Sequence, residues 1–253
     1  MRYAVLSDIH ANLEALSAVL DALQSDPVDR ILCLGDIVGY GADSMPCWEK
    51  LQEREAFIVC GNHEAGCIGK LPLDWFNPAA RAALEWTRDR LGFLELDTLR
   101  RLPLTHVEEP FTLVHSGLRH PERFPYLFDV AQMIDTLAVC RTPVCLIGHT
   151  HVPCLVEYDR ERRRLGRTLI GMSALQGEIP LMIEPGGGMR TLINPGSVGQ
   201  PRDGDARASF AIIDVKRLTL VIRRVGYDVA SAQRKIREAG LSPFLADRLE
   251  VGR

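Results

Sequence analysis

Five short clusters of polar residues lie within the first 151 positions, each where an apolar run gives way to glycine or a turn. The clusters are Asp8-Ile9-His10, Gly35-Asp36-Ile37-Val38-Gly39, Gly61-Asn62-His63-Glu64, Val114-His115-Ser116-Gly117 and Gly148-His149-Thr150-His151. Only a shared ion or substrate would gather so many nitrogen and oxygen donors at the ends of strands. The set therefore predicts a metal site rather than unrelated core or surface residues.

The donor set indicates which metals and which reaction such a site would serve. It holds two carboxylates, one amide oxygen and several imidazoles but no thiolate, a mixture that favours Mn, Fe, Co, Ni or Zn over calcium. Two divalent ions would outweigh the two carboxylates, and the net positive site could hold a phosphate and acidify a water. Paired ions about 3.5 to 4 Å apart clamp the attacking and leaving oxygens of an in-line displacement. The clusters thus predict a two-metal phosphoesterase.

Strand geometry is the expected way in which the chain positions these groups. Residues two apart in a strand point to the same side, so Asp8 and His10 should reach one ion together, as should His149 and His151 if that segment is extended. The first three apolar runs each end just before a cluster. We expect these clusters at the carboxyl ends of adjacent strands, where open α/β sheets form ligand crevices.

The chain reads as strand–helix–strand units up to residue 151 and as short β segments afterwards, which indicate a second sheet. Predicted strands span residues 3–6, 31–34, 57–60, 111–114 and 144–147, then 155–158, 169–170, 181–183, 191–193, 210–215 and 218–223. Predicted helices begin after Asn12, after Asp43 or Ser44, and at Asn77-Pro78, the last running to Leu91 with Gly92 at its end. Others span about 129–139 and the stretch from Asp228 to Gly240, with a helical tail from Ser242.

Composition is that of an ordinary globular protein and predicts one domain over residues 1–253. Apolar residues make up 46% and charged residues 25%, and the formal charge of −3 argues against a large basic surface. We therefore expect no stable nucleic-acid complex, and bound cations would have to attract any anionic substrate locally. Nothing in the sequence indicates an oligomeric state.

The seven cysteines form neither an even set nor a Cys-x-x-Cys pair, and Cys33, Cys60 and Cys145 lie in apolar runs. Such thiols mostly behave as small hydrophobes, which predicts a reducing compartment. We find no apolar core of a signal peptide and no run that approaches membrane-spanning length. A cytoplasmic protein without membrane contact is expected.

The ordered set Asp8-x-His10, Gly35-Asp36-x-x-Gly39, Gly61-Asn62-His63-Glu64, His115 and Gly148-His149-x-His151 resembles the calcineurin-like metallophosphoesterase superfamily. Residues 194–202 are similar to a segment of its small bacterial phosphodiesterase branch, so the resemblance covers almost the whole chain. It implies an α/β (α+β) fold, in which a two-sheet β-sandwich is flanked by helices and holds the metals at one end.

The resemblance also implies a role for each residue of the clusters. His63 would stand outside the metal shell, beside the leaving-group oxygen. It would donate a proton or stabilise developing charge while a metal-bound hydroxide attacks phosphorus. Two divalent ions, with manganese among the candidates, would be held by Asp8, His10 and His151 on one side, by Asn62, His115 and His149 on the other, and by Asp36 between them.

Two positions depart from one branch of the superfamily. Members that act on phosphoproteins have an aspartate and an arginine after the second motif, where this chain has Gly39 and Tyr40. The departure argues against a protein phosphatase. It also removes the usual partner of the catalytic histidine, which leaves Glu64 as a candidate to orient His63.

Some residues allow two interpretations from sequence alone. Asn194-Pro195-Gly196-Ser197 is either a plain turn or, as the resemblance implies, a segment near the site, and Arg202 could then bind a phosphate of the substrate. His106 and His120 are expected to be ordinary surface histidines.

The expected activity is that of a phosphodiesterase acting on phosphodiester or phosphoanhydride bonds of a small nucleotide-like molecule. A dinucleoside polyphosphate hydrolase, for example of diadenosine tetraphosphate, and a phosphomonoesterase are the enzymatic alternatives. The rival of another class is a catalytically silent binding scaffold. The intact ligand set argues against it, because unpaired acidic and imidazole groups in one cleft would be costly to keep without ions.

Overall fold

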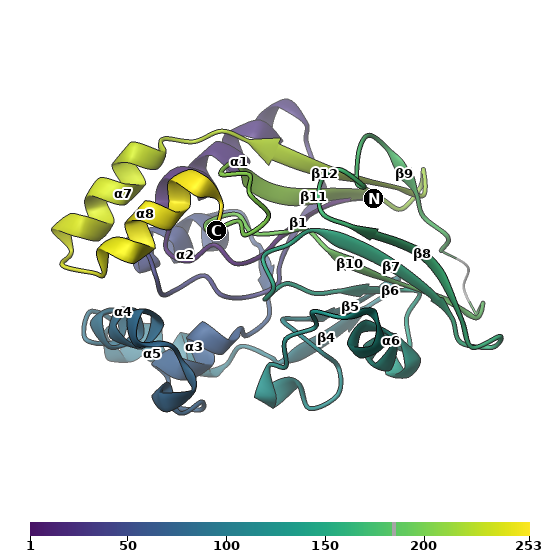
Figure 1. Ribbon diagram of the computed structural model, residues 1–253, viewed down its shortest axis with the longest axis horizontal. Coiled ribbons are helices and arrows are strands. Elements are labelled where there is room, and N and C mark those ends of the chain that lie inside the picture. The colour runs from purple at the N-terminus through teal and green to yellow at the C-terminus, as the bar shows by residue number, and fades with distance from the viewer. Residues whose placement is uncertain (184–185) are drawn as a thin grey trace.

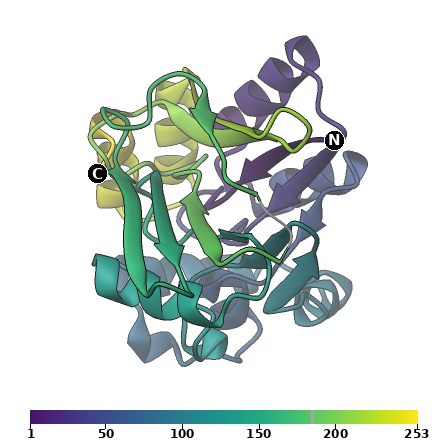
Figure 2. The same ribbon diagram turned by 90° about the vertical axis from the view of Figure 1, so that its right-hand side faces the viewer.

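The computed structural model describes residues 1–183 and 186–253, which form two six-stranded sheets packed face to face with helices outside them (Figure 1, Figure 2). The strand order is β3-β2-β1-β11-β12-β9 in the first sheet and β4-β5-β6-β10-β7-β8 in the second. The predicted two-sheet β-sandwich flanked by helices is therefore confirmed.

The first sheet combines parallel and antiparallel pairs. Strand β2 pairs in parallel with both β1 and β3, while β11 pairs with β1 in the antiparallel sense. The parallel run places the carboxyl ends of β1, β2 and β3 along one edge, as the sequence predicted. The strands are β1 (Arg2–Leu6), β2 (Arg30–Cys33), β3 (Phe57–Ile58), β9 (Ile179–Pro180), β11 (Ala208–Asp214) and β12 (Thr219–Val225).

The second sheet takes strands from both halves of the chain. Strand β6 pairs in parallel with β5 and β10, and antiparallel pairs complete both edges. Its strands are β4 (Thr105–Glu108), β5 (Phe111–Val114), β6 (Val144–Leu146), β7 (Cys154–Asp159), β8 (Arg164–Ile170) and β10 (Met189–Asn194).

A second sheet is present, as expected, but the β segments after residue 151 do not build it alone. Strands β7, β8 and β10 join β4, β5 and β6, whereas β9, β11 and β12 extend the first sheet. The physical reason is that β1 and β6 each have a second edge that needs a hydrogen-bonding neighbour, and later strands supply one to each sheet. Short apolar runs do not reveal which edge they will pair with.

The main core lies between the two sheets. Tyr3 and Val5 of β1 point into it, where they meet Leu113 of β5 and Leu146 of β6. Ala4 and Leu6, which alternate with them, point outward and pack in the apolar cluster that includes residues of α1. Because both faces of β1 are buried, its sequence is an unbroken apolar run rather than an alternating one.

Several helices begin at the caps that the sequence indicated. The side chains of Asn12, Asn77, Asp129 and Asp228 each accept a hydrogen bond from a backbone N–H of the first turn. None of the helices among the described residues is long and apolar enough to cross a membrane. The helices are α1 (Leu13–Ser25), α2 (Ser44–Glu53), α3 (Asn62–Cys67), α4 (Pro78–Arg88), α5 (Phe93–Arg100), α6 (Val130–Val139), α7 (Val229–Glu238) and α8 (Pro243–Val251), with 3-10 turns η1 (Leu73–Trp75) and η2 (Pro121–Arg123).

Two predicted boundaries need correction. Helix α4 ends at Arg88 rather than Leu91, and Gly92 is the N-cap of the unpredicted helix α5. Glycine is favoured both after a helix and, more weakly, before one, so its position alone did not distinguish the two roles. Residues 181–183 are not a strand, because the pairing with β12 is confined to Ile179 and Pro180.

The C-terminal helices α7 and α8 form a hairpin that lies above α4 in the view of Figure 1. Ile236 of α7 and Leu245 of α8 belong to one apolar cluster with Tyr40 and Ala83. Lys235 ties α7 to the first sheet's helices, since its Nζ lies 2.6 Å from Glu14 Oε1 and 2.7 Å from Asp43 Oδ2. The end of the chain is therefore packed against the loop that follows β2.

Candidate metal centre

Loops from both sheets meet at one end of the sandwich and carry the side chains that the sequence singled out as ligands. Each of these side chains belongs to a residue that is at most 7% exposed. Residues far apart in the chain are thus gathered in one buried place. They are Asp8 and His10 after β1, Asp36 after β2, Asn62 at the start of α3, His115 after β5, and His149 and His151 after β6.

The expected strand geometry of these residues was wrong, although their convergence was not. Asp8, His10, Asp36, His149 and His151 all have φ between +50° and +66°, so they lie in left-handed turns. Non-glycine residues rarely adopt this conformation, which costs free energy and concentrates at functional sites. Turns, rather than alternation along a strand, bring each Asp-x-His or His-x-His pair to one point.

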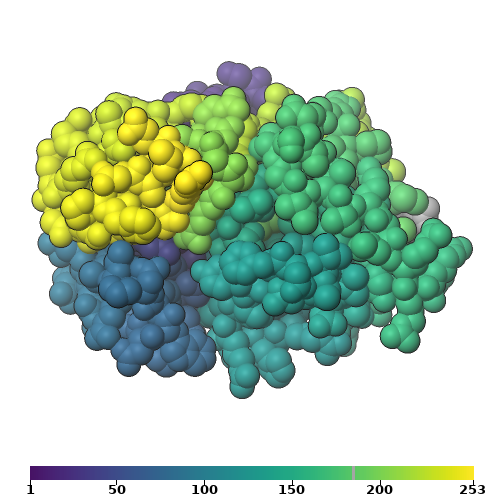
Figure 3. All heavy atoms as spheres, in the orientation of Figure 1, coloured from purple at the N-terminus to yellow at the C-terminus, as the bar shows by residue number. Residues whose placement is uncertain are grey.

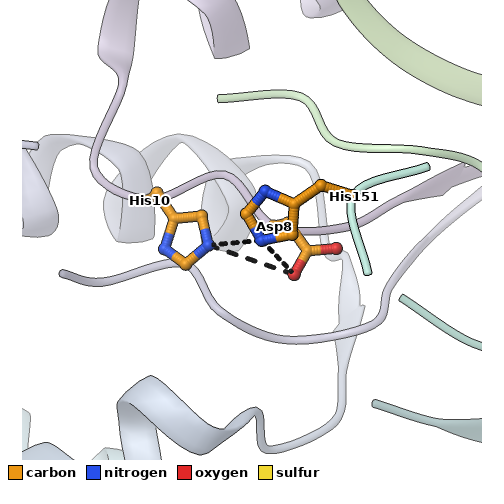
Figure 4. Close-up of side chains that lie close together, drawn as sticks. All are labelled: Asp8, His10 and His151. Atoms are coloured by element: carbon orange, nitrogen blue, oxygen red, sulfur yellow. Dashed lines mark hydrogen bonds and ion pairs between the residues drawn. The ribbon is translucent and has the colours of Figure 1, made fainter. Parts of the chain in front are cut away.

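The first group of donors consists of Asp8, His10 and His151 (Figure 4). The Asp8 Oδ1 atom lies 3.4 Å from His151 Nε2 and 4.0 Å from His10 Nε2. The two Nε2 atoms are 3.2 Å apart. Figure 4 shows the two rings and the carboxylate directing these atoms toward one another.

Backbone carbonyls fix which ring nitrogens of this group carry hydrogen. His10 Nδ1 lies 3.3 Å from Val38 O, and His151 Nδ1 lies 2.5 Å from Gln200 O. Because a carbonyl oxygen only accepts, Nδ1 is the protonated nitrogen of each neutral ring and Nε2 presents a lone pair. Two lone pairs and a carboxylate oxygen facing each other repel, and a bound cation removes that repulsion. The donor set therefore fits a divalent metal ion.

The second group is built around His115. Its Nδ1 faces Leu34 O at 2.7 Å, which leaves Nε2 directed at the centre. That Nε2 lies 3.1 Å from Asn62 Oδ1, 3.1 Å from His149 Nδ1 and 3.4 Å from Asp36 Oδ2. The Nε2 atom of His149 is buried without a hydrogen-bond partner among the described residues. Ring nitrogens and side-chain oxygens that could serve as metal ligands therefore converge in this second group as well.

Asp36 lies between the two groups. Its Oδ2 is 3.4 Å from His115 Nε2 and 3.7 Å from His10 Nε2, so one carboxylate oxygen faces a ring of each group. Its Oδ1 accepts a hydrogen bond of 2.8 Å from the backbone N–H of His63. Asp36 thus connects the two groups of donor side chains.

The electrostatics of the cluster favour positive charge at its centre. Burial would raise the pKa of Asp36, but nearby His115 and His63 hold it well below its usual range. Burial would lower the pKa of His115, yet Asp36 and then Asp8 raise it to about 9. Burial raises the pKa of Asp8 to about 6, which shows how costly an uncompensated carboxylate is there. A cation placed among these groups would be strongly attracted.

Glu64, the candidate for orienting His63, uses its side chain to support the neighbouring loops. Its buried carboxylate accepts hydrogen bonds from the backbone N–H groups of Asp36, Ile37 and Gly61 at 2.7 to 2.9 Å, and from Val38 at 3.2 Å. A carboxylate that accepts several N–H groups clamps them together. Glu64 thus holds the Asp36 loop against the loop that begins α3.

His63 is oriented by packing. Its ring lies 4.5 Å from the Tyr40 ring, 4.6 Å from that of His10 and 5.4 Å from that of Phe76, centroid to centroid. A side chain at Gly39, whose φ is +80°, would come within 2.2 Å of His63 Nδ1, so glycine makes room for the ring. Burial lowers the pKa of His63 to about 4. The residues that replace the aspartate and arginine of phosphoprotein-directed members therefore build the histidine's pocket.

The segment from Asn194 onward lies against the metal-site loops, which decides between the two interpretations of this stretch. Asn194 Nδ2 donates to Gly148 O at 2.7 Å, and Ser197 Oγ donates to Asp8 O at 2.7 Å. Gln200 contributes the carbonyl that faces His151. The stretch is a support for ligand-bearing loops of both sheets.

A cavity of about 420 Å³, here called the inner cavity, opens beside the site. Asn62, His63 and His149 line it, together with the aromatic residues Tyr40 and Tyr126. The Tyr126 ring is stacked on that of His149, with centroids 3.8 Å apart and planes at 23°. A substrate in this cavity would meet both the donor groups and His63.

Arg202, predicted to bind a phosphate, lies beside this cavity rather than among the donor groups. Its Nη2 donates to Gln200 Oε1 at 3.0 Å and lies 3.4 Å from Tyr40 Oη. Tyr40 and Tyr126 were missed by sequence reasoning, since neither forms part of a ligand motif. The one available signal was the aromatic side chain of Tyr40 directly after the Gly35–Gly39 motif.

His106 is part of edge strand β4, and His120 lies in an exposed turn, both as expected.

Comparisons with known proteins agree with this geometry. An uncharacterized protein of Methanocaldococcus jannaschii is 38% identical over 259 aligned residues, which cover 99% of this chain and 98% of that protein. The crystal structure of a metallophosphoesterase from Sphaerobacter thermophilus matches with a TM-score of 0.82 and 37% identity, and the match covers 100% of both chains.

A further relative is a symmetrical bis(5'-nucleosyl)-tetraphosphatase of Methylobacillus flagellatus, 30% identical over 125 residues. This match covers 46% of the present chain and 43% of that protein. The family model that describes the calcineurin-like phosphoesterase superfamily domain matches residues 1–218. The chain therefore belongs to the calcineurin-like phosphoesterase superfamily.

Proposed function

We propose that this phosphoesterase uses two divalent metal ions to hydrolyse phosphodiester or phosphoanhydride bonds of a small nucleotide-like substrate. The observation that carries the proposal is the position of Asp36, whose carboxylate faces one imidazole of each donor group at 3.4 and 3.7 Å. Asp8, His10 and His151 would hold one ion, and Asn62, His115 and His149 the other. The donors suit Mn, Fe, Co, Ni or Zn.

The bound ions would supply positive charge to the phosphate oxygens and would acidify a water. The protein's part is to hold the substrate in line with these donors and to exclude competing groups. Asp36 and Glu64 fix the two central loops through backbone N–H groups. Because these contacts form before substrate arrives, little reorganisation is needed during the reaction.

His63 is proposed as the proton donor to the leaving oxygen. Its ring forms part of the inner cavity wall, beside Asn62 and His149 of the second donor group. An imidazole in this position can interact with the oxygen on which charge develops. The packing of Tyr40 and Phe76 keeps the ring in place for this contact.

A nucleotide-like substrate is supported by two features. Aromatic rings line the inner cavity, where a planar base can pack. The Methylobacillus flagellatus relative is named for the hydrolysis of dinucleoside tetraphosphates, which favours a dinucleoside polyphosphate hydrolase as the narrower candidate.

Both sheets contribute donors, which supports the proposal that residues 1–253 act as one domain. The seven free buried thiols support a cytoplasmic location.

Relative turnover of three substrates tests this function. We expect protein loaded with manganese to hydrolyse bis-p-nitrophenyl phosphate faster than p-nitrophenyl phosphate, and excess EDTA to abolish both activities. Diadenosine tetraphosphate turned over with a still higher kcat/KM would support the narrower candidate. Metal-loaded protein that is inactive on all three substrates would contradict the proposal and favour a silent binding scaffold.

A further inference from the structure

A second, larger cavity of about 760 Å³, here called the outer cavity, adjoins the inner one. The two share Tyr40, Asn77 and Tyr126 in their walls, so the outer cavity lies directly beside the inner one, which is lined by His63 and His149. The far wall is formed by helix α8 at the C-terminus. In Figure 3 the C-terminal helices (yellow), the α4 region below them (blue) and the segment near residue 125 (teal) meet on one face of the molecule.

The charges around the two cavities are one-sided. Arg202 and Arg248 line the outer cavity and Arg123 lines the inner one, whereas no described residue in either wall is Asp or Glu. This contrasts with the formal charge of −3 of the whole chain. The walls next to the reaction site are therefore cationic in a protein that is slightly acidic overall, which favours an anionic ligand.

Neither Arg202 nor Arg248 forms an ion pair with an Asp or Glu side chain within the described ranges. Arg248 Nε donates a hydrogen bond to the main-chain oxygen of Arg253. The Nε of Arg202 is buried and makes no hydrogen bond to any described residue. Burial, and next the charge of Arg202, lower the pKa of Arg248, so the two guanidinium groups are close enough to repel. An anion between them would remove the repulsion and satisfy both.

Aromatic surface lies beside these two arginines. Phe244, on the same helix as Arg248, is 58% exposed and lines the outer cavity, as does Tyr126, which is 41% exposed. The Arg248 guanidinium lies 5.1 Å from the Phe244 ring centroid. Exposed aromatic rings next to cationic groups are suited to a planar base joined to a phosphate.

We propose that the outer cavity binds the non-reacting part of a nucleoside polyphosphate, with a second phosphate between Arg202 and Arg248 and the base against Phe244. This inference rests on the proposed function, since it places the reacting phosphate in the inner cavity. It assigns to α8 the discrimination between substrates with one phosphate and substrates with several.

Binding to metal-free protein tests this site independently of hydrolysis. Calorimetric titrations in excess EDTA would use ADP and pyrophosphate as probes on wild-type protein, Arg248→Gln and Phe244→Ala. We expect Arg248→Gln to weaken both probes about tenfold, the loss for one charge-assisted contact. Phe244→Ala should weaken the binding of ADP about fivefold or more, because base stacking is lost. The factor by which it weakens the binding of pyrophosphate should be at least three times smaller than the factor for ADP.

Arg234→Gln is the matched control, because Arg234 lies on α7, is exposed and lines neither cavity. It removes the same charge and should change neither affinity. Thermal unfolding of each variant shows that the fold is retained. The inference would be overturned if wild-type protein showed no saturable binding, or if Arg248→Gln and Arg234→Gln bound the probes with equal affinity. It would also be overturned if Phe244→Ala lost affinity for ADP and pyrophosphate by the same factor.

Steady-state kinetics separate a failure of this inference from a failure of the proposed function. In metal-loaded protein, Arg248→Gln should raise KM for diadenosine tetraphosphate at least five times more than KM for bis-p-nitrophenyl phosphate. Equal effects on both substrates would overturn the outer-cavity site while leaving the phosphoesterase proposal intact. A wild-type protein that binds ADP but hydrolyses none of the substrates would overturn the phosphoesterase proposal and leave the outer-cavity site intact.

Discussion

Replacing Asp36 by asparagine is expected to lower hydrolysis of bis-p-nitrophenyl phosphate by more than about 100-fold, the upper end of what is lost when even a group supporting a metal ligand is removed. Asp36 lies 3.4 Å from His115 and 3.7 Å from His10, closer to both rings than Asp8, which lies 4.0 Å from each. Asparagine keeps an Oδ1 that can accept from the His63 N–H, so the loop should stay folded while the negative charge between the ions disappears.

The control for this variant is Asp97→Asn. Asp97 also pairs with a cationic side chain, Arg101, but on the outside of α5, and its loss should leave the activity within about twofold because exposed ion pairs contribute little. Steady-state rates of wild type and both variants at saturating manganese provide the measurement. An Asp36→Asn protein with wild-type turnover would show that the carboxylate does not hold the reactive site together.

The second large effect is expected for His63→Gln, which should lower kcat by about 100- to 10,000-fold, the range of general acid catalysis. Metal content should stay at the wild-type value, because every proposed ligand is retained. Elemental analysis and kcat measured on the same preparations separate the two roles. The distinction is needed because His63 has a ring nitrogen within 4.8 Å of ligand atoms of His10 and Asp36.

A matched control for His63→Gln is His120→Gln in an exposed turn. It should leave both kcat and metal content unchanged. If His63→Gln protein instead lost about half of its metal, His63 would be a ligand, and the assignment of a proton donor to this position would be wrong.

Much of the framework around the site followed from local sequence signals. The apolar run of β1 and the caps at Asn12 and Asn77 are determined by nearby residues, because strand burial and N-terminal hydrogen bonds are local effects. The convergence of Asp8 and Asp36 followed from the rule that parallel strands end at the same edge of a sheet. These were therefore predictable without knowing the tertiary structure.

The local geometry of the ligands was not predictable in the same way. His10 and His151 lie in left-handed turns, and each ring is held by a distant backbone carbonyl, Val38 O for His10 and Gln200 O for His151. The Glu64 carboxylate likewise accepts hydrogen bonds from backbone N–H groups of another loop. Sequence spacing contains no direct information on such partners.

The wall of the substrate cavity is a further non-local feature. Tyr126 and Phe244 come from segments that carry no ligand motif, and the position of Phe244 depends on how α8 packs against the rest of the molecule. Phe244 is an exposed residue of a helix whose other face is apolar. In the sequence it is indistinguishable from a surface residue without function.

Anomalous X-ray scattering at the manganese edge, from crystals grown with manganese, tests the central claim most directly. The account predicts two peaks per chain, one among Asp8, His10 and His151 and one among Asn62, His115 and His149, with the Asp36 carboxylate between them. A map without peaks at this end of the sandwich, or with Asp36 and His149 turned away from any bound ion, would contradict it.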